Sequence, residues 1–372
     1  MKIVYIVSTL KGSGPINILY NITKYINRDK FSPVIITLSP EPKGSMINKF
    51  DELDIPVKKL NLSRVEGVLI GVKKIKSVLK EINPDVIHTH GHRADIMATS
   101  IKSGYPIVST IHNYPYEDYI MKYGKIVGSL IAVANVRAFK KMAQPIACSR
   151  TIAKLMENHD VKAESIQNGV DQTLFSPQLM EEKIELRKKL GIPINKTVFI
   201  SIGSLIKRKN PEMAINAFKK AEVNDQALLI VLGNGTLKQT CIDLVENSES
   251  IKILGHVDNV NQYLRASDYF VSTSLSEGLP NTVLESLATG VPVILSNIDQ
   301  HKEILVYKKE AGVLFDVNNS EQLSHTYRDT VKSLNDNTKK DAALNIIENH
   351  LNAKCMTVNY ERAYEKVVKE FG

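Results

Sequence analysis

Short apolar runs alternate along the whole chain with longer segments in which apolar residues recur at helical spacing. The short, β-branched runs predict buried strands, and the recurring pattern predicts helices between them. Strands that alternate with helices form parallel βαβ units, so each half of the chain predicts a parallel sheet. The expected strands are 2–8, 33–38, 86–90, 107–112, 145–149, 197–203, 227–233, 251–255, 269–274 and 291–296.

This pattern predicts an α/β protein with two doubly wound, Rossmann-like domains, because 372 residues are too many for one ordinary core. We expect a first domain over 1–168 and a second over 169–345, joined at the turn Asn168-Gly169. The remaining segment, 346–372, has a helical pattern and no strand after it. We expect it to pack back on the first domain.

The composition is that of a globular protein, with 43% hydrophobic and 24% charged residues. The net charge of +8 is uneven: residues 1–165 hold 24 Lys and Arg against 14 Asp and Glu, and the rest holds 24 against 26. A basic half favours contact with a polyanion or an anionic membrane, although a merely soluble basic surface explains it equally well. No aromatic-rich basic motif is present, so we expect no nucleic-acid binding.

Three cysteines lie far apart and match neither a metal spacing nor a disulfide framework. The chain starts on a β-rich run rather than on a signal peptide. Its longest apolar stretch, 126–136, has 11 residues, whereas a bilayer-spanning helix needs about 20. These features predict a cytoplasmic protein.

Gly12, Ser13 and Gly14 form a predicted turn between the first strand and the next helix. Glycines in such a turn let backbone amides approach a phosphate. The third glycine of a dinucleotide fingerprint is missing, because Asn17 stands in its place, so we expect no NAD site. A structural turn and a phosphate loop explain the remaining pair equally well.

His88, His90 and His92 alternate at the end of the strand 86–90 and beyond it, so their side chains share a face. A zinc site is one interpretation of this spacing. We favour polar residues that line a cleft, because no cysteine and no further histidine is close in sequence. His112 ends the next strand and is expected at the same edge.

In the second half, Lys207, Arg208 and Lys209 follow the strand that ends at Gly203. Three cations on a loop at strand ends suit a diphosphate, although a solvated charge run is the common alternative. Gly233 and a second glycine two residues later predict another tight turn on this edge.

Two glutamates flank a Gly-Leu-Pro-Asn turn, Glu277 before it and Glu285 after it. We expect Asn281 to be the N-cap of the following helix and Glu285 to lie in its first turn. A carboxylate there can accept two hydrogen bonds from a ribose diol, while turn amides and the helix dipole hold phosphate oxygens. Glu277 can accept from sugar hydroxyls.

These motifs together resemble the large retaining glycosyltransferase family that includes glycogen-synthase-like enzymes (group 1, family 4) and has the GT-B fold, two Rossmann-like domains that face a central cleft. The mark of the family is two glutamates separated by seven residues, as here. The resemblance covers nearly the whole chain, through "VYIVSTLKGSGPINILYNI", "PDVIHTH", "STIHN", "IQNGVD", "IGSLIKRKN", "GNG" and "TSLSEGLPNTVLESLATGVPVILS".

The resemblance implies that Glu277 contacts the donor sugar and that Glu285 binds ribose. It implies that Lys209 neutralises the leaving diphosphate and that His112 lies near hydroxyls of the donor sugar. Gly14 would approach the diphosphate or the acceptor. Further donor contacts are expected from Ser204, Arg208, Gly233, Gly278, Leu279, Asn281 and Thr282, and acceptor-side positions from Gly12, Ser13, His88, His90 and Arg93.

One departure is that Ser204 stands where the family often has an arginine, so Arg208 is the candidate substitute. The chain has no Asp-x-Asp motif, and we expect neither metal nor cofactor. The expected function is retaining transfer from a nucleotide sugar, a UDP-sugar in particular, to a glycan or polyprenyl-linked acceptor in bacterial surface polysaccharide synthesis. The alternatives are a sugar-nucleotide epimerase of the same architecture and a basic nucleic-acid-binding protein.

The segment 118–144 surrounds the apolar stretch with lysines and an arginine. We expect one basic amphipathic helix here that lies on the inner face of an anionic membrane. The alternative is a helix that simply packs against the first sheet.

Overall fold

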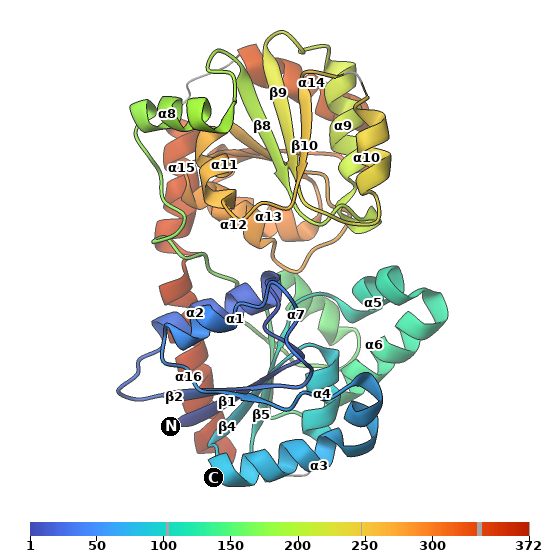
Figure 1. Cartoon of the computed structure of the whole chain (residues 1–372), viewed down its shortest axis with the longest axis vertical. Helices are drawn as coiled ribbons and strands as arrows, with labels where there is room; N and C mark the ends of the chain where they lie inside the picture. Colours follow the sequence, from blue (N-terminus) through green and yellow to red (C-terminus); the bar gives the residue numbers. More distant parts are fainter. Residues whose placement is uncertain (102–103, 247, 333–336, 372) are drawn as a thin grey trace. The chain divides into compact units, whose positions relative to one another are not determined.

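The computed structural model describes residues 1–101, 104–246, 248–332 and 337–371. The chain divides into two compact units (Figure 1). Unit 1 is Met1–Gly169 with Ala353–Gly372, and unit 2 is Val170–Asn352. Both are parallel sheets covered by helices, which confirms the α/β, doubly wound prediction.

The described strands of unit 1 form one parallel sheet in the order β3-β2-β1-β4-β5-β6-β7. β1 lies near the middle and is buried on both faces, with Tyr5 on one side and Val4 and Ile6 on the other. The strands are β1 Lys2–Val7, β2 Ser32–Thr37, β3 Val57–Lys59, β4 Val86–His90, β5 Ile107–Ile111, β6 Gln144–Ala147 and β7 Glu164–Ser165. The helices are α1 Gly14–Tyr25, α2 Ile47–Asp51, α3 Arg64–Ile82, α4 His92–Ser100, α5 Pro115–Tyr123, α6 Lys125–Phe139, α7 Arg150–Glu157 and α16 Ala353–Phe371.

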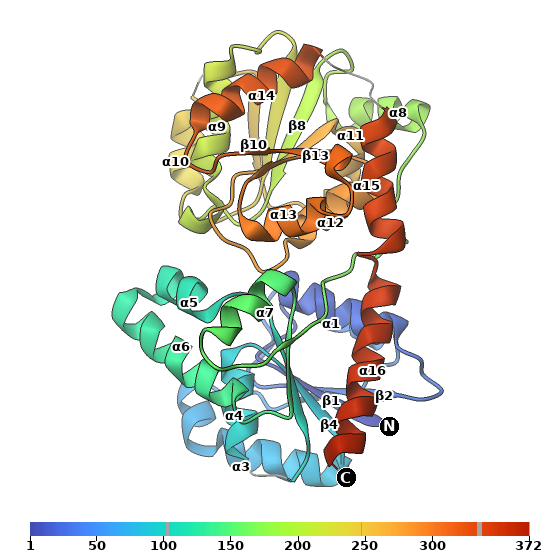
Figure 2. The same cartoon turned by 180° about the vertical axis from the view of Figure 1, so that it is seen from behind.

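The last helix, α16, completes the core of unit 1. Met356, Tyr360, Tyr364 and Val367 recur at helical spacing and are buried in the same cluster as Tyr5. Figure 2 shows α16 beside α1, with which it is in contact. The helix starts at Ala353 rather than at residue 346, since residues up to 349 belong to α15 of unit 2.

The described strands of unit 2 form a second parallel sheet in the order β10-β9-β8-β11-β12-β13. They are β8 Thr197–Ile202, β9 Ala227–Leu232, β10 Ile251–Gly255, β11 Tyr269–Ser272, β12 Val293–Ser296 and β13 Gly312–Phe315. The helices are α8 Met180–Leu190, α9 Pro211–Ala221, α10 Lys238–Leu244, α11 Val260–Ala266, α12 Asn281–Ala288, α13 Asp299–Leu305, α14 Ser320–Lys332 and α15 Asn337–Asn349, with 3-10 turns η1 Lys207–Lys209 and η2 Lys309–Ala311.

The segment 118–144 is not the single helix that its pattern predicted. Gly124, with a φ of +81°, ends α5 and starts α6, and the two helices pack side by side (Figures 1 and 2). Close packing requires Gly128, because a Cβ there would overlap the carbonyl oxygen of Tyr119. Gly128, Ala132 and Val136 are buried, so one face of the apolar stretch packs inside unit 1.

Within the described ranges, no helix is both long enough and apolar enough to cross a bilayer.

Candidate active site

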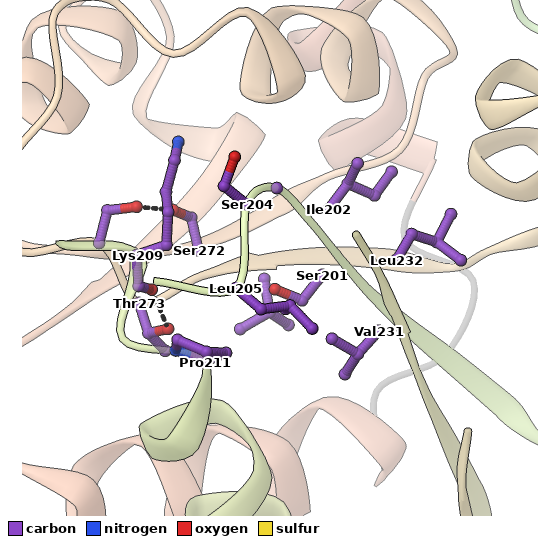
Figure 3. Close-up of a pocket in the computed structure, with 13 residues that line it drawn as sticks. Ser201, Ile202, Ser204, Leu205, Lys209, Pro211, Val231, Leu232, Ser272 and Thr273 are labelled. Atoms are coloured by element: carbon purple, nitrogen blue, oxygen red, sulfur yellow. Dashed lines mark hydrogen bonds between the residues drawn. The ribbon is translucent and has the colours of Figure 1, made fainter. Parts of the chain in front are cut away.

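The loops after β8, β9, β11 and β12 lie at one edge of the unit 2 sheet, because the carboxyl ends of its parallel strands share that edge. A pocket of about 20 Å³, room for about one water, lies there and is lined by Ser204, Lys209 and the end of β11. Figure 3 shows the side chains of Ser204 and Lys209 extending in the same direction. The cationic loop is therefore at the edge where such sheets bind ligands.

Gly233 and Gly235 let the loop after β9 lie directly on the loop after β8. A Cβ on Gly233, which has a φ of +138°, would overlap the carbonyl oxygen of Gly203. A Cβ on Gly235 would overlap the carbonyl oxygen of Leu205, whose amide donates to the carbonyl of Asn234 at 3.0 Å. Packing alone requires both glycines, and the donor contact expected of Gly233 stays a prediction.

Glu277 is the buried anion of this edge, with 5% of its side chain exposed. Its Oε1 accepts hydrogen bonds from Lys209 Nζ at 2.5 Å and from Ser274 Oγ at 2.6 Å. Arg208 Nη1 donates to Oε2 at 2.9 Å and to the carbonyl oxygen of Ser276 at 2.6 Å. Both cations therefore point toward Glu277, and we call the three residues the ion triad.

The two cations keep Glu277 ionised although it is buried. Burial would raise the pKa of its carboxyl, but Lys209, Arg208 and the hydrogen bond from Ser274 outweigh burial and lower the pKa to about 2. A buried carboxylate without such partners would be strongly destabilising. The triad therefore carries two positive charges and one negative charge at neutral pH.

Backbone contacts join the cationic loop to the loop that carries Glu277. Thr273 Oγ1 donates to the carbonyl oxygens of Lys209 at 3.1 Å and Asn210 at 2.7 Å. The amide of Leu275 donates to the carbonyl oxygen of Arg208 at 2.8 Å. The triad is thus held by its backbone as well as by its charges.

Glu285 differs from Glu277 in both position and charge. It is the fifth residue of α12, because Asn281 already belongs to the helix and Pro280 precedes it without a side-chain cap bond. The predicted N-cap at Asn281 and first-turn position of Glu285 are therefore wrong. Burial raises the pKa of Glu285 to about 7, and the charge of Lys209 opposes this only in part. Among the described residues, no hydrogen bond or ion pair engages its carboxylate.

The other expected donor contacts lie on the same edge of unit 2. Gly278 and Leu279 are buried in the turn, Asn281 and Thr282 are half-buried at the start of α12, and Ser204 is exposed. Their ligand contacts stay predictions.

In unit 1, Gly12, Ser13 and Gly14 form an exposed turn between β1 and α1. α1 begins at Gly14, and Ser13 makes no side-chain cap bond. The amide of Gly12 donates to the carbonyl of Gly44 at 3.3 Å, so the turn lies against the loop before α2. Local geometry accounts for these residues, and their ligand contacts stay predictions.

His90 is the last residue of β4, and His112 directly follows the neighbouring strand β5. Their rings stack with centroids 5.1 Å apart, and His90 Nδ1 lies 2.9 Å from His112 Nε2. Burial lowers the pKa of His112 to about 3, so its ring is neutral at pH 7. His112 lines a pocket of unit 1, whereas His90 is buried behind it.

His88 does not line a cleft, contrary to our expectation. It is fully buried, with Nδ1 2.8 Å from the hydroxyl of Tyr364 and Nε2 2.8 Å from that of Thr110. His88 and His90 do point to one face of β4, but α16 covers that face. In the part of the chain that the structure describes, no three His, Cys, Asp or Glu side chains are placed to hold a metal ion.

The side chain of Arg93 makes hydrogen bonds within unit 1. Its guanidinium donates to Ser39 Oγ at 2.5 Å and to the carbonyl oxygen of Ser63 at 3.4 Å, which ties α4 to the start of α3. The acceptor contact expected of Arg93 stays a prediction.

Comparison with known families matches this arrangement unit by unit. A model described as Glycosyltransferase Family 4 matches residues 13–174, and one described as Glycosyl transferases group 1 matches residues 182–347. The chain belongs to the group 1 glycosyltransferases.

Relatives and solved structures resemble this glycosyltransferase over most of its length. It is 27% identical to the O-antigen biosynthesis glycosyltransferase WclY of Escherichia coli, over 100% of this chain and 99% of that protein. It is 28% identical to the E. coli UDP-Gal:alpha-D-GlcNAc-diphosphoundecaprenol alpha-1,3-galactosyltransferase, over 71% of this chain and 70% of that protein. The crystal structure of Anabaena HepE in complex with UDP superposes with a TM-score of 0.82 at 19% identity, over 98% and 100% of the two chains, and this likeness shows the GT-B fold.

One polar residue at this sheet edge was not singled out in the sequence. His301, on α13, is buried with its Nδ1 2.8 Å from the carbonyl oxygen of Ser296. A carbonyl only accepts, so Nδ1 carries the proton and Nε2 is an acceptor, for which the described residues provide no partner. The charge of Glu277 acts on this ring. The sequence feature that could have identified His301 was its position shortly after β12, at the same sheet edge.

The triad makes a prediction about stability and pH. Glu277→Gln leaves Lys209 and Arg208 without their anion, so the free energy of unfolding at pH 7 should fall by about 3 kcal/mol. The folded protein lowers the pKa of Glu277 from 4.5 to about 2, so its stabilising contribution is present above pH 4.5 and is lost as the pH falls toward 2. Urea unfolding at pH 7 and pH 3 should therefore show a smaller difference between wild type and variant at pH 3.

Glu285→Gln is the matched control, because burial disfavours the charge that it removes. It should leave the stability at pH 7 unchanged or increased. Two results would contradict the ion triad: an equal loss of unfolding free energy in both variants, or a loss in Glu277→Gln that does not change with pH.

Proposed function

We propose that this glycosyltransferase moves a sugar from a UDP-sugar to a lipid-linked acceptor, with retention of the anomeric configuration, in the synthesis of a bacterial surface polysaccharide. The observation that carries the proposal is the ion triad beside an unpaired Glu285 on one sheet edge. Two cations suit a diphosphate, and a free carboxylate suits a ribose diol. The E. coli relative named UDP-Gal:alpha-D-GlcNAc-diphosphoundecaprenol alpha-1,3-galactosyltransferase supports the same donor and acceptor classes.

Lys209 and Arg208 neutralise the charge that develops on the leaving UDP. Fixed charges of this kind stabilise a transition state without reorganisation, and together with the α12 dipole they supply what a metal supplies elsewhere. Arg208 takes the place of the arginine missing at position 204, because the triad holds its side chain beside Lys209. The leaving phosphate receives the acceptor proton, as the family resemblance implies.

Glu277 acts mainly through these cations. Its Oε1 already accepts two hydrogen bonds, from Lys209 and Ser274, and fills its two lone pairs. Oε2 accepts one, from Arg208, which leaves one lone pair for a hydroxyl of the donor sugar.

The test is UDP release from a panel of UDP-sugars with α-D-GlcNAc-diphosphoundecaprenol in detergent as the acceptor. Lys209→Ala should lower kcat at least about a hundredfold, since it removes a charge contact made to the transition state. Arg208→Ala should lower kcat about tenfold or more. Lys207→Ala, the exposed third cation of the loop, is the control and should retain wild-type kinetics.

UDP release that does not depend on an acceptor, or no release from any UDP-sugar, would contradict lipid-linked transfer. Unchanged kinetics in Arg208→Ala would mean that Arg208 does not replace the missing arginine.

We also propose that the tip of the α5–α6 hairpin contacts an anionic membrane. Ile126, Val127 and Leu130 are 79%, 52% and 67% exposed on the first turns of α6, although each is strongly apolar. Lys122 and Lys125 precede them in the chain and are also exposed, so an apolar surface lies beside positive charge. Such a tip inserts among lipid headgroups while its lysines attract anionic lipids.

Sedimentation with anionic and neutral vesicles tests this contact. The wild type should bind vesicles that contain phosphatidylglycerol at low salt and lose binding at high salt. Replacing Ile126, Val127 and Leu130 together by serine should weaken binding at least about tenfold. Val306→Ser, which changes an equally exposed valine of unit 2, should not. Wild-type protein that stays in the supernatant under every condition would contradict the proposal.

A further inference from the structure

A second pocket of unit 2 lies at the amino ends of the sheet strands, opposite the edge that carries the ion triad. Its volume is about 250 Å³, which corresponds to about eight waters at roughly 30 Å³ each. Asp268, Tyr269 and Pro292, which line it, stand just before or at the start of β11 and β12. The first turn of α8, the ends of α11 and α12, and α15 also border the pocket (Figure 1). None of its residues was expected in a site from the sequence.

The lining of this pocket carries more positive than negative charge. Three cations, Lys183, Arg265 and Lys340, border it together with one carboxylate, Asp268, which leaves a formal charge of +2. Asp268 is already shared between two cations. Lys183 Nζ donates to its Oδ1 at 2.6 Å, and Arg187 Nη2, from the buried side of α8, donates to its Oδ2 at 2.6 Å.

Arg265 and Lys340 line the pocket without an anion of their own. Arg265 Nε donates to the carbonyl oxygen of Ser176 at 3.0 Å and its Nη2 to Ser176 Oγ at 2.7 Å, which fixes the guanidinium. The stem of Lys340 packs on Gly290, since a Cβ there would lie 3.1 Å from Lys340 Cγ. Among the described residues, Arg265 Nη1 has no hydrogen-bond partner and no carboxylate pairs with either cation.

The ammonium of Lys183 responds to this excess of positive charge. Burial and the charges of Arg187 and Lys340 lower its pKa, although Asp268 at 2.6 Å opposes them. The cations of the pocket therefore repel one another more than one carboxylate compensates. A bound anion would offset that repulsion.

Apolar side chains border the same pocket. Leu179 and Met180 are 71% and 64% exposed at the start of α8, and Val291 and Pro292 also line the space. A ligand that matches both features has an anionic group for the cations and a small apolar body for these side chains.

We propose that this pocket binds a soluble phosphate monoester with a small apolar body. Its phosphate lies among Lys183, Arg265 and Lys340, because two cations without carboxylate partners match the roughly two negative charges of a monoester. Its body lies against Leu179 and Met180. This site is separate from the sheet edge assigned to the donor, and it requires neither a donor nor an acceptor of the transfer reaction.

The test is calorimetric titration with phenyl phosphate at pH 8, at an ionic strength kept constant with chloride. Lys340→Gln and Arg265→Gln should each weaken binding at least about tenfold, because each removes a charge-assisted contact to the phosphate. Lys340→Arg keeps the charge and should bind within about threefold of wild type. Lys189→Gln, which removes an exposed lysine of α8 that does not line the pocket, should bind within about twofold. Inorganic phosphate, which lacks the apolar body, should bind more weakly and depend on Lys340 in the same way.

A second control separates this pocket from the ion triad, whose cations also attract phosphate. Lys209→Ala should bind phenyl phosphate within about twofold of wild type, because Lys209 lies at the opposite edge of the sheet. Saturating UDP should not displace phenyl phosphate from the wild type.

Three results would overturn the proposal: no binding of about 10 mM phenyl phosphate to the wild type, Lys340→Gln that binds as Lys189→Gln does, or binding that Lys209→Ala or UDP abolishes. Vesicles that contain phosphatidic acid present the same monoester on a lipid. Wild-type protein that binds these vesicles through Lys340 but does not bind phenyl phosphate would assign the pocket to a lipid headgroup and overturn the soluble ligand.

Discussion

The structure of the site depends on one constraint: a buried carboxylate, Glu277, has to be neutralised. Arg208 and Lys209, on the neighbouring loop, supply the compensating positive charge and hold the pKa of the Glu277 carboxyl at about 2. Because the anion and the cations follow different strands, the loops after β8 and β11 must lie together. The hydroxyl of Thr273 fixes that contact by donating to the carbonyl oxygens of Lys209 and Asn210. Gly233 and Gly235 let the loop after β9 pack closely against the loop after β8. Two cations are thereby presented at the edge where a parallel sheet binds its ligand.

The second glutamate, Glu285, has the opposite electrostatic character: the pKa of its carboxyl is raised, whereas that of Glu277 is lowered. Glu277 is ionised and committed to protein partners, so it organises the site. Glu285 is partly buried, titrates near neutral pH and has no partner among the described side chains, so its carboxylate stays available to a ligand.

Hydrophobic periodicity predicted the elements that are buried on both faces, and it failed where burial is slight. β1 and β9 are nearly continuous apolar runs and were found, whereas β3, β7 and β13 lie at sheet edges, are at most partly buried and were not found. Spacing and strand ends located Glu277, Glu285, Lys209 and His112, but not the direction of Arg208, which depends on a contact 69 residues away. His88 was misplaced because its covering helix, α16, comes 265 residues or more later in the chain. The pocket that Asp118 and Lys122 line in unit 1 was not predicted, because only the fold of the hairpin turns them toward it.

The division between the two glutamates is the central claim, and the pH dependence of UDP binding tests it most directly. If a ribose diol binds the ionised form of Glu285, whose pKa is about 7 in the free protein, binding releases a proton. The UDP affinity of the wild type should then rise about tenfold between pH 6 and pH 8. Glu285→Gln is the control, because any rise in its UDP affinity comes from titration of the UDP phosphate and of other groups. The tenfold rise is expected in addition to the rise seen in this variant. Isothermal titration across that range measures both proteins. Identical pH profiles for wild type and Glu285→Gln would contradict the claim.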